Sequence, residues 1–381
     1  MENNTTKDFK FELIHQSSRS KARVGRIHTP HGIIDTPSFV AVGTNATLKA
    51  LDSHTADELG LQLMFCNTYH LMVQPGTELI KEAGGLHKFL NRKNPIITDS
   101  GGFQVFSLAQ GDTKDELKSR SNKKHDGSVL KISEEGVLFR SYRDGRKILL
   151  TPETSIQAQK DLGADIIIPF DELPPYTISQ SKLKQSLDRT HRWEKRSLDE
   201  HKLNINNQAL YAVIHGGVDK TMRKESCDYL GSLDFDGYSI GGSLGKNHQE
   251  LFELLEYVVP ALPSDKPNHL LGIGDLKAIE KCVVAGIDTM DCSHPTRAAR
   301  HGVLFTSEGE LKLMNSRYRQ DFGTIDPKCE CTTCKHYSRA YLQHLFKAKE
   351  LTAMTLATMH NLHYMIKLMA ELREKILMDL I

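Results

Sequence analysis

The sequence predicts an α/β fold: a (β/α)8 TIM barrel with antiparallel insertions and a C-terminal cysteine-rich subdomain. Three observations support this prediction. Short apolar runs alternate with helix-like stretches, two inserted segments carry β-hairpin signals, and three cysteines crowd together near the end of the chain.

Eight apolar runs, each ending at a small or charged residue, form the repeating part of the pattern. They cover residues 37–43, 61–67, 95–99, 164–170, 209–215, 235–241, 269–274 and 286–291. Continuous runs of this kind are typical of buried parallel strands, and their alternation with helices indicates βαβ units. Eight units over roughly 250 residues predict a closed barrel. An open doubly wound sheet is the alternative.

Helices are expected at 151–162, where Thr151, Pro152 and Glu153 occupy capping positions, and at 181–202. Residues 9–34 precede the first run and are predicted to form an antiparallel segment that closes the bottom of the barrel. Between the third and fourth runs, the polar segment 110–126 is expected to be mobile. Residues 137–142 and 147–150 then flank Asp144-Gly145, a hairpin signal. We expect a barrel catalytic domain over 1–300 and a metal-binding subdomain with C-terminal helices over 301–381.

Composition excludes some classes of protein. No stretch approaches the roughly 18 apolar residues of a membrane span, and the polar residues 1–10 lack the apolar core of a secretory signal. We therefore expect a cytoplasmic protein without a membrane partner. The net charge of +1 shows no overall basic excess, so any surface for nucleic acid must be local.

The cysteines favour a metal site over disulfides. Cys329, Cys331 and Cys334 crowd into a CxCxxC cluster, whereas the other four of the seven are scattered. Thiolates at this spacing suit tetrahedral Zn²⁺, which needs a fourth ligand, either His360 or His363 in the predicted helix 352–377. Because no strand-end residue takes part, this zinc is predicted to be structural.

Three carboxylates fall at the ends of apolar runs, where barrel enzymes gather their chemistry. They are Asp99, Asp171 and Asp291. One Asp after a strand is often only a helix cap, but three at strand ends indicate a site. The pairs Gly101-Gly102 and Gly241-Gly242 would let the backbone approach a flat ligand.

Such carboxylates suit glycosidic chemistry. One would attack the sugar carbon, another would move protons at the leaving group, and a third would bind a base edge. A zinc-dependent barrel hydrolase is the rival reaction class. It needs metal ligands at several strand ends, and only His215 among the run-end residues fits.

The motifs themselves resemble one family. Residues 99–104 (DSGGFQ), 170–172, 235–242 and 291–297, with the zinc spacing that closes on His360, resemble the queuine tRNA-ribosyltransferases, or tRNA-guanine transglycosylases. The resemblance covers nearly the whole chain and favours His360 over His363 as the zinc ligand.

The resemblance implies a reaction and partners. The expected reaction exchanges the wobble guanine of a tRNA with a GUN anticodon for a 7-deazaguanine base, by double displacement through a covalent enzyme–RNA intermediate. The implied assembly is a homodimer with structural Zn²⁺. The alternative is a non-catalytic tRNA-binding subunit, against which the retention of all three aspartates argues.

The resemblance also implies roles for site residues. Asp291 would be the nucleophile, Asp99 the general acid/base and Asp171 the binder of the base edge, while Phe103 and Leu271 would stack on the base. The other expected substrate-binding residues are Ser100, Gly101, Gly102, His215, Gly241, Gly242 and Gly245. The expected RNA-binding residues are Gly272, Arg297 and Arg300.

Several positions depart from the usual bacterial pattern, and three of them concern the base. His215 replaces a Gln, Leu173 replaces a Cys, and Gly245 replaces a Val. An imidazole cannot reproduce the paired donor and acceptor of an amide. Loss of a Val side chain at Gly245 would open room near position 7 of the base, which leads to the hypothesis that the enzyme salvages or tolerates queuine; the incoming base is expected to be queuine or its aminomethyl precursor.

Overall fold

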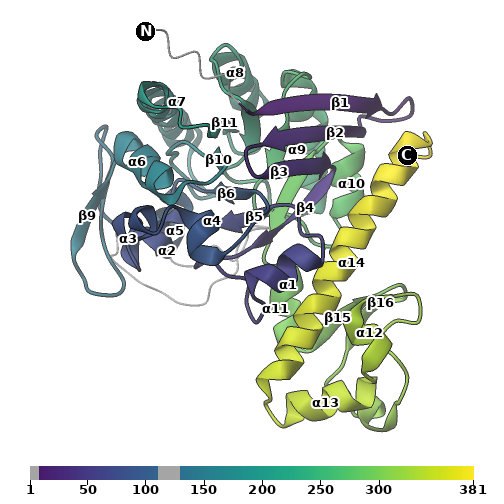
Figure 1. The fold of residues 1–381 in the computed structure, drawn as a ribbon. Helices are drawn as coiled ribbons and strands as arrows, with labels where there is room; N and C mark the ends of the chain where they lie inside the picture. Colours follow the sequence, from purple (N-terminus) through teal and green to yellow (C-terminus); the bar gives the residue numbers. More distant parts are fainter. Residues whose placement is uncertain (1–7, 110–128) are drawn as a thin grey trace.

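The chain folds into a closed barrel of eight parallel strands (Figure 1). The computed structural model describes residues 8–109 and 129–381. The barrel strands are β4 (Ser38–Val42), β5 (Met64–Cys66), β6 (Ile96–Thr98), β10 (Ile166–Ile167), β11 (Ala209–Ile214), β12 (Gly237–Ile240), β13 (Asn268–Leu270) and β14 (Thr289–Cys292). Strand β14 pairs with β4 and closes the ring. Each predicted run overlaps a barrel strand, so the barrel is confirmed and the open sheet is wrong.

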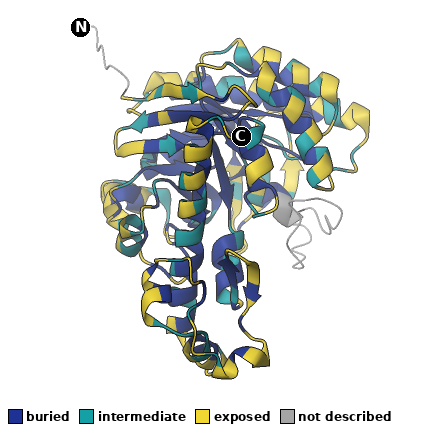
Figure 2. Cartoon of the chain, turned by 90° about the vertical axis from the view of Figure 1, so that its right-hand side faces the viewer, coloured by how far each residue is buried: buried dark blue, intermediate teal, exposed yellow. Residues whose placement is uncertain are grey.

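The barrel interior is a packed apolar core. Side chains from several strands meet there, among them Val40, Phe65, Ile97, Ile168 and Val213. A larger apolar cluster fills the space between the strands and the surrounding helices. Figure 2 shows buried residues along the strands and exposed ones on the outer helices. Because the interior is filled, a ligand has room only at the strand ends.

Helices cover the outside of the barrel. They are α1 (Ser53–Glu58), α2 (Thr68–Val73), α3 (Thr77–Glu82), α4 (Leu86–Leu90), α5 (Gly102–Ala109), α6 (Pro152–Leu162), α7 (Gln180–Leu203), α8 (Lys220–Gly231), α9 (His248–Val258), η1 (Val259–Ala261), α10 (Ile279–Val284) and α11 (His294–Arg300). Helix α6 begins at a capping box, in which Thr151 and Thr154 each accept the other's backbone N–H, and ends at Gly163 with φ of 69°. Helices α6 and α7 confirm the two predicted helices.

An antiparallel sheet closes the amino-terminal end of the barrel, as predicted. It consists of β1 (Lys10–Gln16), β2 (Arg23–Thr29) and β3 (Gly32–Thr36). Ile27 and Ile34 on this sheet are buried in the same cluster as Ala209, the first residue of β11. The sheet therefore seals the end opposite to the strand ends where the carboxylates lie.

A second antiparallel sheet lies in the insertion before α6. The two predicted segments form β8 (Val137–Arg140) and β9 (Lys147–Leu150), and they pair as a hairpin. Strand β7 (Val129–Ile132) was not predicted. It is short, mostly exposed and shifted in register, so it leaves no clear alternation in the sequence. The segment 110–126 lies outside the described residues.

The C-terminal part carries a small sheet and three helices beside the barrel. The elements are β15 (Val303–Thr306), β16 (Gly309–Lys312), η2 (Ser316–Gln320), α12 (Thr332–His336), α13 (Arg339–Lys347) and α14 (Leu351–Leu377). Helix α14 agrees with the predicted helix. It begins in the small subdomain and runs back along the barrel (Figure 1). Its Ala353 and Leu356 are buried in the subdomain core, whereas Met365 and Leu372 are buried in the barrel's outer core.

A buried ion pair fastens the N-terminal sheet to the barrel. The Arg23 guanidinium donates to both carboxylate oxygens of Asp288, at 2.9 and 2.6 Å. Asp288 Oδ2 also accepts the backbone N–H of Asn268 at 2.8 Å. Both side chains are nearly or fully buried, so removal of one partner leaves the other charge uncompensated.

We expect Arg23→Ala to lower the free energy of unfolding by roughly 3–5 kcal/mol, because it strands the buried Asp288 charge. Arg26→Ala is the matched control. It lies on the same strand and breaks an exposed pair with Asp35, which is worth about 0–1 kcal/mol. Urea denaturation at pH 7 measures both variants, and equal losses would contradict a stabilising role for the buried pair.

Candidate active site

Three strand-end carboxylates line one cavity of about 360 Å³. Asp99 follows β6, Asp171 follows the fourth barrel strand β10, and Asp291 lies on β14. The strands are parallel, so their carboxyl ends meet at one end of the barrel. The sequence placed these three residues at strand ends, and the structure brings them together.

Asp99 is buried and held by donors from the turn after β5. Its Oδ2 accepts a hydrogen bond from Asn67 Nδ2, and its Oδ1 accepts one from the backbone N–H of Thr68, both at 2.7 Å. Burial raises the pKa of Asp99 to about 6, although these donors oppose the shift. A carboxyl with this pKa can gain or lose a proton near neutral pH.

Asp171 is held between two neighbouring strand ends. Ser100 Oγ donates to its Oδ1 at 3.1 Å, and His215 Nε2 lies 2.8 Å from its Oδ2. A Cβ on Gly242, which has φ of 70°, would lie 2.8 Å from His215 Nδ1. A side chain at position 242 would therefore push the imidazole away from Asp171.

Asp291 has a different set of partners. The backbone N–H of Gly272 donates to its Oδ1 at 2.7 Å, and His269 Nε2 lies 3.2 Å from the same oxygen. Both of these contacts end on Oδ1.

Three of these partners, Asn67, Thr68 and His269, were not predicted from the sequence. Leu271 was predicted to bind the base. Because side chains two residues apart along a strand point to the same face, this prediction could also have indicated His269. Asn67 ends the second apolar run, but no carboxylate stands beside it in the sequence.

Six other predicted residues also line the cavity. These are Ser100, Phe103, Gly242, Leu271, Gly272 and Arg297. Phe103 is 43% exposed and therefore accessible to a flat ligand. Leu173, which replaces the Cys of the usual bacterial pattern, lines the cavity as well.

Six predicted residues are not among those that line the cavity, and Gly245 is described separately below. Gly101, Gly102 and Gly241 belong to the backbone around it. His215 contacts Asp171 and lines a neighbouring cavity of about 340 Å³, and Arg300 donates from Nε to the Thr296 carbonyl at 3.3 Å.

Gly245 also lies outside the cavity lining. Its φ is 101°, and a Cβ there would lie 2.6 Å from Glu250 Cβ. Glycine at this position therefore allows a tight turn against Glu250, where a side chain would collide with Glu250.

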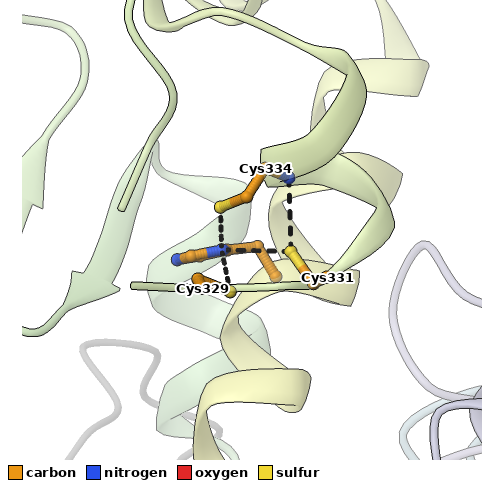
Figure 3. Close-up of side chains that lie close together, drawn as sticks. Cys329, Cys331 and Cys334 are labelled. Atoms are coloured by element: carbon orange, nitrogen blue, oxygen red, sulfur yellow. Dashed lines mark hydrogen bonds between the residues drawn. The ribbon is translucent and has the colours of Figure 1, made fainter. Parts of the chain in front are cut away.

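The cysteine cluster lies in the subdomain, away from the carboxylates. The Sγ atoms of Cys329, Cys331 and Cys334 surround the ring of one histidine (Figure 3). They lie 3.7, 3.5 and 3.3 Å from His360 Nδ1, and these four residues form a group that could hold a metal ion. His363 does not belong to that group, so the structure favours His360.

Among the described residues, two further groups of side chains have ligand atoms close enough together to hold a metal ion. Neither group contains Asp99, Asp171 or Asp291. They are His31, His87 and Asp165, and Asp188, His191 and Glu225. Within residues 8–109 and 129–381, no helix has the length and apolar character to span a membrane.

Comparisons with known proteins agree with the geometry. A family model described as queuine tRNA-ribosyltransferase matches residues 17–380. The queuine tRNA-ribosyltransferase of Protochlamydia amoebophila is 65% identical over 373 residues, which cover 98% of this chain and 96% of that protein. The enzymes of the same name from Chlamydia caviae and Chlamydia trachomatis serovar D are 54% and 53% identical over 371 residues, which cover 97% of this chain and 99% of each. The chain therefore belongs to the queuine tRNA-ribosyltransferase family.

Proposed function

We propose that this enzyme exchanges the wobble guanine of tRNAs with a GUN anticodon for a 7-deazaguanine base, by double displacement through a covalent enzyme–RNA intermediate. The observation that carries the proposal is the convergence of Asp99, Asp171 and Asp291 on one cavity. Family membership supports the transferase reaction.

In the first half of the reaction, Asp291 Oδ2 attacks C1′ of the target nucleotide. The new C1′–O bond forms as the bond from C1′ to the base nitrogen N9 breaks, and its electron pair passes to guanine. Asp99 supplies the proton that guanine needs to leave. A pKa of about 6 makes that carboxyl suited to give a proton here and take one later.

In the second half, N9 of the incoming base attacks C1′ and loses its proton to Asp99. The C1′–O bond breaks, and its electron pair returns to Asp291. Asp171 holds the base edge in both halves, positioned by Ser100 and His215. Phe103 and Leu271 stack on the base, and Gly272, Arg297 and Arg300 contact the flanking RNA.

The choice of base depends on the room beside its position 7. Gly245 does not provide that room, because a side chain at this position would point at Glu250 and not at the base. The neighbouring cavity of about 340 Å³, which His215 and Ser243 line, offers space for a bulky substituent. This space supports uptake of queuine, with the smaller aminomethyl precursor as the alternative base.

The cysteine cluster is proposed to bind structural Zn²⁺. Zn–S bonds near 2.3 Å and Zn–N bonds near 2.0 Å in a tetrahedron place S and N roughly 3.5 Å apart, which agrees with the observed separations. His360 Nε2 lies 2.6 Å from the Phe305 carbonyl, so a hydrogen on Nε2 would be donated to that carbonyl and Nδ1 would be left to hold the metal. The ion would hold the subdomain together. A homodimer is carried over from the family.

The exchange reaction is tested with radiolabelled guanine and unmodified tRNA bearing a GUN anticodon. We expect incorporation by the native enzyme and none by Asp291→Ala, which lacks the nucleophile, whereas the exposed control Asp228→Ala stays active. Queuine should compete with the label more strongly than the aminomethyl precursor. Absence of incorporation by the native enzyme would favour the non-catalytic tRNA-binding subunit instead.

The pKa of Asp99 predicts how base uptake depends on pH. The carboxylate must be ionised to accept the N9 proton, so kcat/KM for the incoming base should fall by about tenfold per pH unit below pH 6. Above pH 6 the ionised form dominates and the rate should level off. Asp99→Asn should be slower by about 10²- to 10⁴-fold and should lack this acid limb. An acid limb that persists in the variant would assign the titration to another group.

Metal analysis separates the two candidate histidines. We expect one zinc per chain in the native enzyme and in His363→Ala, but loss of zinc and a lower Tm in His360→Ala, because a closed structural site requires all four ligands. Elemental analysis after exhaustive dialysis measures the zinc content. Full zinc retention by His360→Ala would contradict the assignment.

A further inference from the structure

We propose that Arg223 is a positioning residue for base exchange: its buried guanidinium holds the backbone of the two neighbouring strand ends that contribute His215 and Gly242 to the site. This inference rests on the proposed function. Nothing in the motif pattern indicated Arg223, and the inference comes from the hydrogen bonds that this one side chain makes.

Arg223 lies in α8, the helix that follows β11, and its side chain is completely buried. Its Nε donates to the Gly217 carbonyl at 2.7 Å, and its Nη1 donates to the Ile214 carbonyl. Its Nη2 donates to the carbonyls of Gly241 and Ser243, at 2.9 and 2.8 Å. The guanidinium therefore bonds to four backbone carbonyls at the carboxyl ends of β11 and β12.

No carboxylate among the described residues forms an ion pair with this guanidinium. Burial lowers the pKa of Arg223 to about 10, so the group stays charged at neutral pH. Two other buried arginines, Arg23 and Arg92, are paired with Asp288 and Asp57 respectively. A buried charge is costly unless it is paired or hydrogen-bonded, so the four carbonyls are what compensates the charge of Arg223.

The contacts with Arg223 fix the peptide planes of the loop after β12. In a planar trans peptide, the N–H points opposite to the C=O of the same unit. Because the Gly241 carbonyl points at Arg223, the N–H of Gly242 faces away from Arg223. Gly242 also lines the active-site cavity. The guanidinium therefore sets the orientation of backbone that belongs to the cavity wall.

The same side chain also holds the end of β11. Ile214, whose carbonyl accepts from Arg223, is followed directly by His215, and His215 Nε2 lies 2.8 Å from Asp171 Oδ2. A Cβ on Gly242 would lie 2.8 Å from His215 Nδ1, so the imidazole packs closely against the loop after β12. The spacing between His215 and Gly242 therefore depends on the two backbone segments that Arg223 joins.

The neighbouring cavity of about 340 Å³ depends on the same anchor. Gly217 and Ser243 both line it, and the carbonyls of both accept hydrogen bonds from Arg223. In the proposed function, the base and its substituent occupy these two cavities, whereas Arg297 on α11 contacts the flanking RNA. Loss of the anchor should therefore weaken binding of the free base more than binding of tRNA. Arg223 touches neither the base nor the RNA and acts only through the backbone.

Guanine exchange into a tRNA with a GUN anticodon tests the positioning role. Arg223→Lys keeps the charge but has only three N–H donors for four carbonyls, so KM for guanine should rise by about ten- to hundredfold while KM for tRNA stays within about twofold. Arg92→Lys is the matched control, because Arg92 is also buried and donates to the Leu61 carbonyl at the other end of the barrel. It should lower Tm but leave KM for guanine unchanged. An unchanged KM for guanine in Arg223→Lys, or an equal rise in both variants, would contradict the inference.

Amide hydrogen exchange of the full-length protein measures the backbone independently of activity. Peptides that span 214–218 and 240–245 should exchange at least about tenfold faster in Arg223→Lys than in the native enzyme, and at the native rate in Arg92→Lys. Arg223→Gln, which removes the buried charge, gives the same comparison if the lysine variant does not fold. Unchanged exchange in both segments would overturn the inference. If the native enzyme incorporates no guanine, the proposed function fails, and hydrogen exchange still decides whether Arg223 holds these two strand ends.

Discussion

Three carboxylates line one cavity at the strand ends, where burial removes part of their hydration. Each is compensated by its own donors. Asp99 accepts from the turn after β5, Asp171 is held by a hydroxyl and an imidazole, and Asp291 is held by a backbone N–H and a second imidazole. In the proposed mechanism, these different surroundings give chemically similar groups different reactivities, so that one cavity contains a nucleophile, an acid/base and a base-binding group.

The rest of the fold keeps these surroundings in place. The β14–β4 pairing closes the ring and fixes Asp291 relative to the other strand ends. The N-terminal sheet seals the opposite end, and the ion pair of Arg23 with Asp288 fastens it to the start of β14. Helix α14 joins the cysteine-rich subdomain to the outside of the barrel. Stability and chemistry thus occupy opposite ends of the same strands.

The sequence predicted the barrel and the cysteine cluster well because both leave local patterns. Continuous apolar runs mark strands buried on both faces, and CxCxxC marks a metal site. Strand β7 left no such pattern. Around the carboxylates, the sequence could indicate strand ends but not the partners across the barrel, because His269 meets Asp291 only once β13 and β14 are paired. Gly245 is a different case, because the sequence cannot show that a Cβ at this position would point at Glu250.

The proposed mechanism requires a covalent bond between Asp291 and the RNA. The most direct measurement is to incubate the native enzyme with a GUN tRNA in the absence of free base, digest with ribonuclease and protease, and locate the adduct by peptide mass spectrometry. We expect a ribonucleotide that lacks its base to be attached to Asp291. An adduct mapped to Asp99 or Asp171 would contradict it, as would base exchange that proceeds without any adduct.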